Sequence, residues 1–158
     1  MVGVYFGCPF RLNVVRGDSM APTIRNGSVC VLDEGYYEQH PVRRGDIVTI
    51  DVDGELLTKR VYAAEGQTIR LLQWSDGTYD VPNGEWMRRV GRLKSLNRIL
   101  KPVELTIPAG HCFVVGDNTP VSYDSRAFGP ISTDHIVGKM TGIAISGRES
   151  AVRASERE

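Results

Sequence analysis

The stretch GDNTPVSYDSRAFG, residues 116–129, holds more polar groups between two glycines than an ordinary turn requires. It directly follows the apolar run CFVV, residues 112–115, which is typical of a buried strand. The polar side chains are therefore expected at a strand end. Residues two apart in an extended segment share a face, so Ser122, Asp124 and Arg126 are predicted to line one surface. We expect the last two to form an ion pair that braces the backbone, which leaves Ser122 free to orient another group.

Two earlier segments contain candidates for that group. The stretch GDSMAPTI, residues 17–24, places Ser19 in a turn flanked by glycine and proline, and the stretch LTKRV, residues 57–61, places Lys59 inside an apolar run. A serine hydroxyl is a poor nucleophile unless a base removes its proton during attack. Ser-Lys pairs are an established variant of the catalytic triad. The two segments therefore predict a Ser19–Lys59 pair.

A lysine that acts as a base must be neutral, whereas its reference pKa is about 10.4. Removal from water lowers a lysine pKa, and the apolar neighbours of Lys59 could provide this. The chain also contains His40, His111 and His135, so a Ser-His-Asp triad remains an alternative. None of the three histidines lies in a motif that would direct it at Ser19.

In their order along the chain, four segments resemble the motifs of the type I signal peptidases. They are the serine segment, the strand RGDIV (residues 44–48), the KRV of residues 59–61 and the loop 116–129, and the resemblance covers most of residues 15–140. It implies a serine endopeptidase that removes signal peptides from exported precursor proteins after small residues. The implied roles are nucleophile and base for Ser19 and Lys59, base orientation for Ser122, and structural support for Asp117, Asp124 and Arg126.

The resemblance also implies how the precursor binds. It would be added as an extended strand along the segments before Ser19 and before Lys59. Candidates for shallow apolar pocket walls that admit only small residues are Val15, Met20 and Thr58. The backbone N–H of Ser19 is the expected first donor to the oxyanion. Gly17 stands where some family members have a serine hydroxyl, so the second donor is expected to be a backbone group or water.

We predict a mainly β fold, with a twisted antiparallel catalytic core of the signal peptidase/LexA-like type and a small inserted β-rich cap. Asp53-Gly54 is a strong hairpin signal, and Asp76-Gly77 and Asn83-Gly84 are two more. The spacing of apolar residues in 86–100 fits an amphipathic helix, whereas the resemblance implies short strands there. The predicted divisions are a discontinuous core from 1–65 and 107–146, a cap from 66–106 and a disordered tail from 147–158.

Composition excludes some functions. Lys+Arg and Asp+Glu both number 19, so net charge gives no case for nucleic acid. Cys8, Cys30 and Cys112 lack CxxC spacing, which argues against zinc, and no metal or cofactor is expected. No segment reaches the roughly 20 apolar residues of a spanning helix. Because the family is normally anchored at its N-terminus, a missing or shortened anchor is expected. The basic stretch 88–101 could contact anionic lipid headgroups.

Other readings remain open. A LexA-like self-cleaving regulator shares the dyad, but only 18 residues precede Ser19. An inactive partner subunit of a signal peptidase would not need the complete residue set found here. The two RGD triplets fall inside the enzyme motifs, where turns explain them. We expect action at the extracytoplasmic face of the bacterial cytoplasmic membrane, with the mitochondrial inner membrane as the alternative. An unknown partner subunit could supply the anchor.

Overall fold

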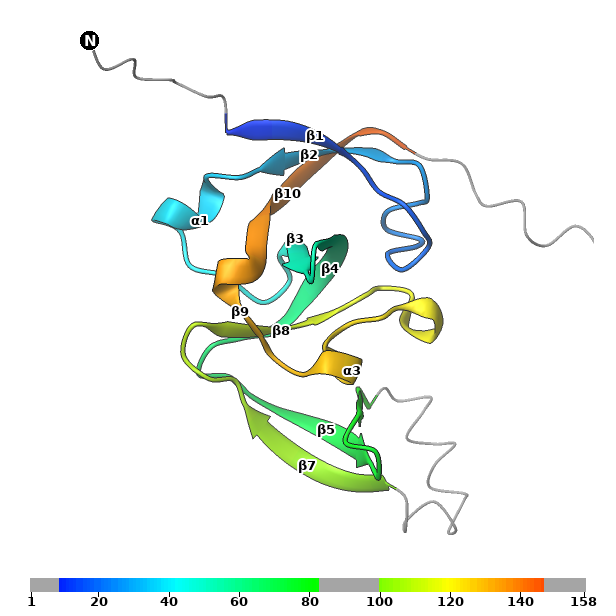
Figure 1. The fold of residues 1–158 in the computed structure, drawn as a ribbon, viewed down its shortest axis with the longest axis vertical. Helices are drawn as coiled ribbons and strands as arrows, with labels where there is room; N and C mark the ends of the chain where they lie inside the picture. Colours follow the sequence, from blue (N-terminus) through cyan, green and yellow to red (C-terminus); the bar gives the residue numbers. More distant parts are fainter. Residues whose placement is uncertain (1–8, 83–99, 147–158) are drawn as a thin grey trace, which may run out of the picture.

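The structure is a computed structural model that describes residues 9–82 and 100–146. In this part of the chain, ten strands form two antiparallel sheets (Figure 1). The predicted mainly β, antiparallel fold is therefore confirmed. The larger sheet contains β1 (Phe10–Val14), β2 (Val29–Asp33), β3 (Ile47–Val52), β4 (Glu55–Ala64), β8 (His111–Val115), β9 (Ile131–Ser132) and β10 (Ile136–Ile145). The smaller sheet contains β5 (Thr68–Trp74), β6 (Tyr79–Asp80) and β7 (Leu100–Thr106).

The larger sheet has the strand order β1-β2-β10-β3-β4-β8-β9. Its last strand in sequence, β10, lies between β2 and β3 and pairs with both. The register of β10 shifts in both pairings, which marks bulges that bend the strand and increase the local twist. β10 therefore joins the pair β1-β2, whose connection carries Ser19, to the half of the sheet that carries Lys59.

The predicted hairpin at Asp53-Gly54 is present between β3 and β4. Both residues have positive φ, 53° and 86°, as a two-residue type I′ turn requires. The Gly54 N–H donates to Asp51 Oδ1 at 2.7 Å, which fixes the turn further. This hairpin sets the register in which Val48 lies opposite Lys59. Lys59 thus occupies the middle of a paired strand, as the sequence indicated.

Strand β4 changes partners along its length. Residues 55–60 pair with β3 along their whole length, whereas β8 pairs only with residues 60–64. Among the residues that the structure describes, the first half of β4 therefore has a free edge. β1 is itself the edge strand of the sheet. Free edges present unpaired backbone groups that can accept an added strand.

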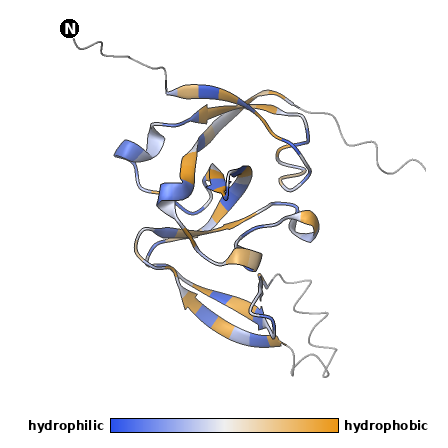
Figure 2. Cartoon of the chain, viewed as in Figure 1, coloured by the Kyte–Doolittle hydropathy of each residue, from blue (hydrophilic) through white to orange (hydrophobic). Residues whose placement is uncertain are grey.

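The smaller sheet lies at one end of the molecule, beyond β8 (Figure 1). The predicted turn at Asp76-Gly77 is present between β5 and β6, where the Trp74 N–H donates to the Thr78 carbonyl at 2.9 Å. Hydrophobic and hydrophilic residues alternate along β5 and β7 (Figure 2), so one face can be buried. That face contributes Ile69 and Leu71 to a buried cluster around Phe113 of β8. The two sheets therefore share one apolar core.

The division into a core (1–65 and 107–146) and a cap (66–106) remains our proposal. The small sheet reaches from Thr68 to Thr106, and its last strand pairs along its whole length with β5. The predicted Asn83-Gly84 turn, the ambiguous segment up to residue 99 and the tail 147–158 lie outside the described residues. The sequence analysis did not predict the short helix α1 (Tyr36–Gln39), which lies in the polar loop before β3.

Candidate active site

Ser19 and Lys59, which are 40 positions apart in the sequence, meet in the structure. The Lys59 amine donates to the Ser19 hydroxyl with an Nζ–Oγ distance of 2.9 Å. Lys59 reaches this position from β4, whereas Ser19 lies in the turn between β1 and β2. The geometry is that of a nucleophile within hydrogen-bond reach of a base.

Lys59 is almost completely removed from solvent, with an exposed fraction of 2%. Val48, directly across in β3, and Val61, two positions along β4, are both fully buried beside it. Burial disfavours the charged ammonium and lowers the pKa of Lys59, and the negative charge of Asp124 only partly opposes this. In the described residues, Lys59 forms no ion pair. Its setting therefore favours a neutral amine.

The loop 116–129 holds the turn that carries Ser19. The Asn118 backbone N–H donates to the Ser19 carbonyl at 2.9 Å, and the Asn118 side-chain amide donates to the Asp18 carbonyl at 3.0 Å. On the other side of the turn, the Gly17 N–H donates to Asn26 Oδ1 at 2.9 Å. The partners of Asn118 and Asn26 could not be predicted, because nothing local in the sequence says which backbone group a distant amide will reach.

Gly116 allows the loop to approach the serine turn closely. A Cβ atom at this position would clash with the Ser122 hydroxyl and with the backbone carbonyl oxygen of Ser19. Gly116 has an ordinary backbone conformation, so the requirement is for space and not for a positive φ. The position of Gly116 directly after a buried strand is the feature of the sequence that could have indicated this close approach.

The loop differs from the extended segment that the sequence predicted. It contains the 3-10 turn η2 (Thr119–Val121) and the short helix α3 (Ser125–Phe128), and Asp124 is the N-cap of α3. The Asp124 carboxylate accepts from the Arg126 backbone N–H at 3.1 Å, so it satisfies a donor of the first helical turn. Ser122, Asp124 and Arg126 therefore do not share the face of a strand. Side-chain capping has replaced the extended conformation.

The predicted Asp124–Arg126 ion pair is nevertheless formed, with an Nε–Oδ1 distance of 2.9 Å. Asp124 is fully buried, and its carboxylate also accepts from the Gly116 N–H at 3.0 Å. Burial alone would raise the pKa of Asp124, but the hydrogen bonds from Arg126 and Gly116 outweigh it and hold the pKa below its usual value. Asp124 is thus a satisfied buried charge that ties the strand end to α3.

Arg126 also organises the loop around Ser122. Its Nη2 donates to the carbonyls of Thr119 and Ser122, at 2.7 and 3.0 Å. The Ser122 hydroxyl is buried close enough to Asp124 to favour the ionised carboxylate, yet it makes no hydrogen bond of good geometry within the described residues. In particular, it makes none to Lys59. The structure brings Ser122 to the site without the contact expected for base orientation.

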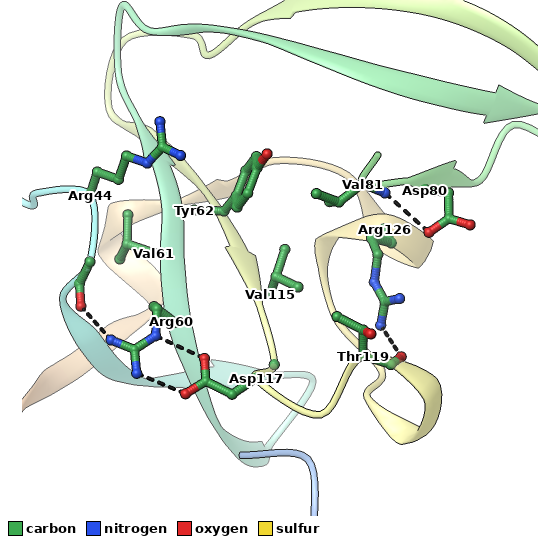
Figure 3. A pocket seen from close by; sticks show the side chains of 12 residues that line it. Arg44, Arg60, Val61, Tyr62, Asp80, Val81, Val115, Asp117, Thr119 and Arg126 are labelled. Carbon is green, nitrogen blue, oxygen red and sulfur yellow. Dashed lines mark hydrogen bonds and ion pairs between the residues drawn. The ribbon is translucent and has the colours of Figure 1, made fainter. Parts of the chain in front are cut away.

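Asp117 has a partner that the sequence analysis missed. Its two carboxylate oxygens accept from Arg60 Nε and Nη2 at 2.8 and 2.7 Å, a bidentate pair seen in Figure 3. The hydrogen bonds from Arg60 lower the pKa of Asp117. Arg60 follows Lys59, and successive strand residues point to opposite faces. The same strand therefore directs Lys59 at Ser19 and ties its other face to the loop.

A groove of about 350 Å³ runs from Ser19 and Lys59 between two walls. One wall consists of residues 13–16 and the other of residues 55–58, which belong to the free edge of β4. Of the predicted pocket residues, Val15 and Thr58 line this groove. Met20 is completely buried in the cluster with Val15 and Ile24 and is not among the lining residues described.

A second hollow of about 370 Å³ lies between β4, the end of β8 and β6 (Figure 3). It contains neither Ser19 nor Lys59. The described residues hold no cluster of histidine, cysteine and carboxylate side chains suited to a metal ion. Cys30 and Cys112 are buried free thiols, and burial raises the pKa of each. Cys8 lies outside the described residues.

The mainly β fold thus places a buried lysine in hydrogen-bond contact with a serine beside an open groove. Comparison with known proteins gives the class: residues 1–145 match the family described as signal peptidase, peptidase S26. The chain belongs to this family of serine endopeptidases, which remove signal peptides.

Curated relatives include signal peptidase I V of Bacillus subtilis (strain 168), which is 36% identical over 137 residues, covering 78% of this chain and 79% of the relative. Signal peptidase IB of Staphylococcus aureus (strain COL) is 28% identical over 155 residues, covering 89% of this chain and 79% of the relative. A solved signal peptidase I from Enterococcus faecalis V583 is 26% identical, with a TM-score of 0.41, and the match covers 65% of this chain and 98% of that chain.

The family is associated with membranes on their extracytoplasmic side. No helix within residues 9–82 and 100–146 is long and apolar enough to cross a membrane.

Proposed function

We propose that Ser19 is the nucleophile and Lys59 the general base with which this signal peptidase cleaves exported precursors after small residues. The observation that carries the proposal is the 2.9 Å contact between the Lys59 amine and the Ser19 hydroxyl, made by a lysine that is 2% exposed. Burial moves the pKa of Lys59 towards the range in which an amine can accept a proton. Among the other groups near Ser19, none in the described residues contacts its hydroxyl.

The reaction begins when the neutral Lys59 amine accepts the Ser19 hydroxyl proton as Oγ attacks the scissile carbonyl. The Ser19 backbone N–H stabilises the oxyanion. The resulting ammonium gives its proton to the leaving amine of the mature protein, which leaves an acyl-enzyme. Lys59 then takes a proton from water as the water oxygen attacks the ester carbonyl. The lysine returns this proton to Ser19 Oγ as the ester bond breaks, which releases the signal peptide with a new carboxyl group and restores the neutral amine. Ser122 orients the amine, and Asp117, Asp124 and Arg126 hold the loop that carries it.

The precursor binds as an extended strand between the walls of the groove. The free edge of β4 and the edge strand β1 supply backbone donors and acceptors on both sides of such a strand. Val15 and Thr58 form shallow walls beside the scissile bond, and they favour small residues there because larger side chains find no room. Met20 supports the Val15 wall from behind.

We place this activity at the extracytoplasmic face of a bacterial cytoplasmic membrane, because the relatives described above are bacterial proteins. The mitochondrial inner membrane is the alternative. The substrates are precursors that carry signal peptides. The proposal also includes contact with the membrane surface and a partner subunit.

Cleavage of a synthetic precursor peptide with alanines before the scissile bond, followed by mass spectrometry, tests the proposal. The wild-type chain should cleave at one bond, and Ser19→Ala should abolish cleavage while keeping the circular dichroism spectrum. Ser75→Ala, in the turn after β5, is the matched control and should remain active. Persistent cleavage by Ser19→Ala would overturn the assignment. A wild-type chain without activity would point to an inactive partner subunit.

A further inference from the structure

The groove contains two charged side chains that the proposed chemistry does not use. Glu55 lies on the β4 wall and Arg16 on the facing wall. Glu55 precedes Lys59 by four residues in the same strand, so the two side chains share a face. At the usual rise of a strand, Glu55 is about 13 Å from Lys59 along β4. Glu55 therefore lies towards the end of the groove that is distant from Ser19.

Both side chains are open to solvent in the free enzyme. Within residues 9–82 and 100–146, neither forms an ion pair. The charge of Glu55 is nevertheless felt inside the groove: burial lowers the pKa of Lys59, and Asp124 and Glu55 both oppose that shift. During attack Lys59 is neutral, so it cannot balance Glu55 in the reactive state. Arg16, on the facing wall, forms no ion pair with Glu55 within the described residues, so a substrate side chain is left to balance this charge.

We infer that Glu55 is a specificity-determining residue that faces the precursor about four residues before the scissile bond and favours a basic side chain there over an acidic one. The inference rests on the proposed function, because it takes the small residues of the peptide to lie beside Val15 and Thr58. A strand added along β4 advances at the same rise per residue as β4 itself. We take the peptide to run parallel to β4, and in that orientation the peptide residue level with Glu55 is about four before the residue level with Lys59.

The expected preference is moderate because Glu55 is exposed. Exposed ion pairs typically change an equilibrium by less than about fivefold, and a like charge has a similar effect of opposite sign. Attraction of lysine and repulsion of glutamate together predict roughly a tenfold ratio of kcat/KM. Salt should reduce this ratio, since exposed charges are screened.

The test uses peptides that differ only at the fourth or the fifth residue before the scissile bond, where lysine, glutamine or glutamate is placed. Two positions are needed because neighbouring side chains of an extended peptide point in opposite directions. kcat/KM is measured at low salt, at a pH on the upper plateau of the rate profile, where Lys59 is already neutral. The wild type should prefer lysine to glutamate about tenfold in one series. Glu55→Gln should bring that ratio close to one, and Glu55→Lys should reverse it.

Asp53→Asn is the matched control. It removes the same charge from the tip of the same hairpin, but Asp53 does not line the groove. Asparagine also tolerates the positive φ of 53° at this position. This variant should keep the wild-type ratio, and peptides with the charge four residues after the scissile bond should show no preference.

A wild-type ratio near one in both series, or a ratio that Glu55→Gln leaves unchanged, would overturn the inference. If Asp53→Asn lost the preference for lysine over glutamate as completely as Glu55→Gln, the inference would also be overturned. The preference would then depend on the net charge of the hairpin and not on a residue of the groove. Cleavage of the glutamine peptide by the wild type tests the proposed function alone. The two proposals can therefore fail independently.

Discussion

Lys59 and Asp124 are both charged side chains removed from solvent, with exposed fractions of 2% and 0%, yet their surroundings are opposite. Asp124 accepts hydrogen bonds from the Gly116 N–H and from three N–H groups of Arg126. Lys59 has one polar contact among the described residues, the hydroxyl of Ser19. The buried charge whose hydrogen bonds are satisfied stabilises the loop. The buried amine that has no carboxylate partner is the one whose pKa is lowered towards neutral pH. Such a shift is typical of a reactive group.

The largest effect on activity is expected for a substitution of Lys59, and it distinguishes Lys59 from Asp124. Lys59→Met should lower the cleavage rate about 10²–10⁴-fold, the usual contribution of a general base. The variant should be at least as stable as the wild type near neutral pH, because methionine fills the space without a buried amine. Peptide cleavage and thermal unfolding measure the two properties. Lys101→Met, on the exposed part of β7, is the control. Substantial activity in Lys59→Met would assign the base to a histidine or to water.

Asp124→Ala should have the opposite profile, with a large loss of stability. Removing one partner of a buried pair leaves Arg126 uncompensated and typically costs about 3–5 kcal/mol. For a chain of this size, the melting temperature should fall by roughly 10 °C. Asp117→Ala should cost less, because the Arg60 side chain that it leaves is 35% exposed and water can replace the lost contacts. A fully stable but inactive Asp124→Ala would place this carboxylate in the chemistry.

The pH dependence of stability should have the same sign for both residues but should fall in different pH windows. The folded pKa of Lys59 lies below 10.5, so between these two values the unfolded chain holds a proton that the folded chain lacks. The stability of the wild type relative to Lys59→Met should therefore rise with pH through that window. Asp124 has a folded pKa below 3.8, so its contribution is present above 3.8 and lost as the pH falls through the folded value. Denaturant unfolding across pH measures both.

The same shift predicts that cleavage increases with pH through a group that titrates below a free lysine. The rate profile of His40→Ala should keep this ascending limb, since the His40 ring bonds to the Tyr36 carbonyl and not to Ser19. An ascending limb centred at the pKa of a free lysine would contradict the role of Lys59. So would an ascending limb that disappears in His40→Ala.

The smallest effect is expected at Ser122. Its hydroxyl has no partner of good geometry in the described structure, so Ser122→Ala should leave the melting temperature nearly unchanged. Activity should fall by at most roughly 10²-fold if the hydroxyl orients Lys59 during the reaction, which is the cost of a small misplacement of a reacting group. An unchanged rate would show that packing alone positions Lys59. Ser122 would then have no part in the contrast between Lys59 and Asp124.

Much of the fold followed from local patterns. Asp53-Gly54 specifies a type I′ turn by itself, and that turn fixes the register of Lys59. The pairing of Asp124 with Arg126 was also predicted, but the conformation between them was not. An aspartate two residues before a backbone N–H can cap a helix or lie in a strand, and only packing decides which.

Other parts of the site depend on contacts between residues far apart in the sequence. Asn118 holds the carbonyls of Ser19 and Asp18, and Arg60 pairs with Asp117 across 57 positions. The alternation of β4 indicates that Arg60 points away from Lys59, but the partner that it reaches is set by the tertiary arrangement of the loop. The groove likewise arises from where β8 stops pairing with β4, which no single segment specifies.

The position of β10 in the larger sheet has a consequence for biosynthesis. The Ser19 turn leaves from β1 and Lys59 lies on β4, and these strands belong to halves of the sheet that β10 joins. A ribosome releases β10 after every other strand of the structure. Until that strand is inserted, the sheet lacks one of the two connections, β10 and the loop 116–129, that set the hydroxyl and the amine in register. The nascent chain therefore carries both reactive groups before the sheet that positions them is complete, and we expect it to become competent to cut only after β10 has been released.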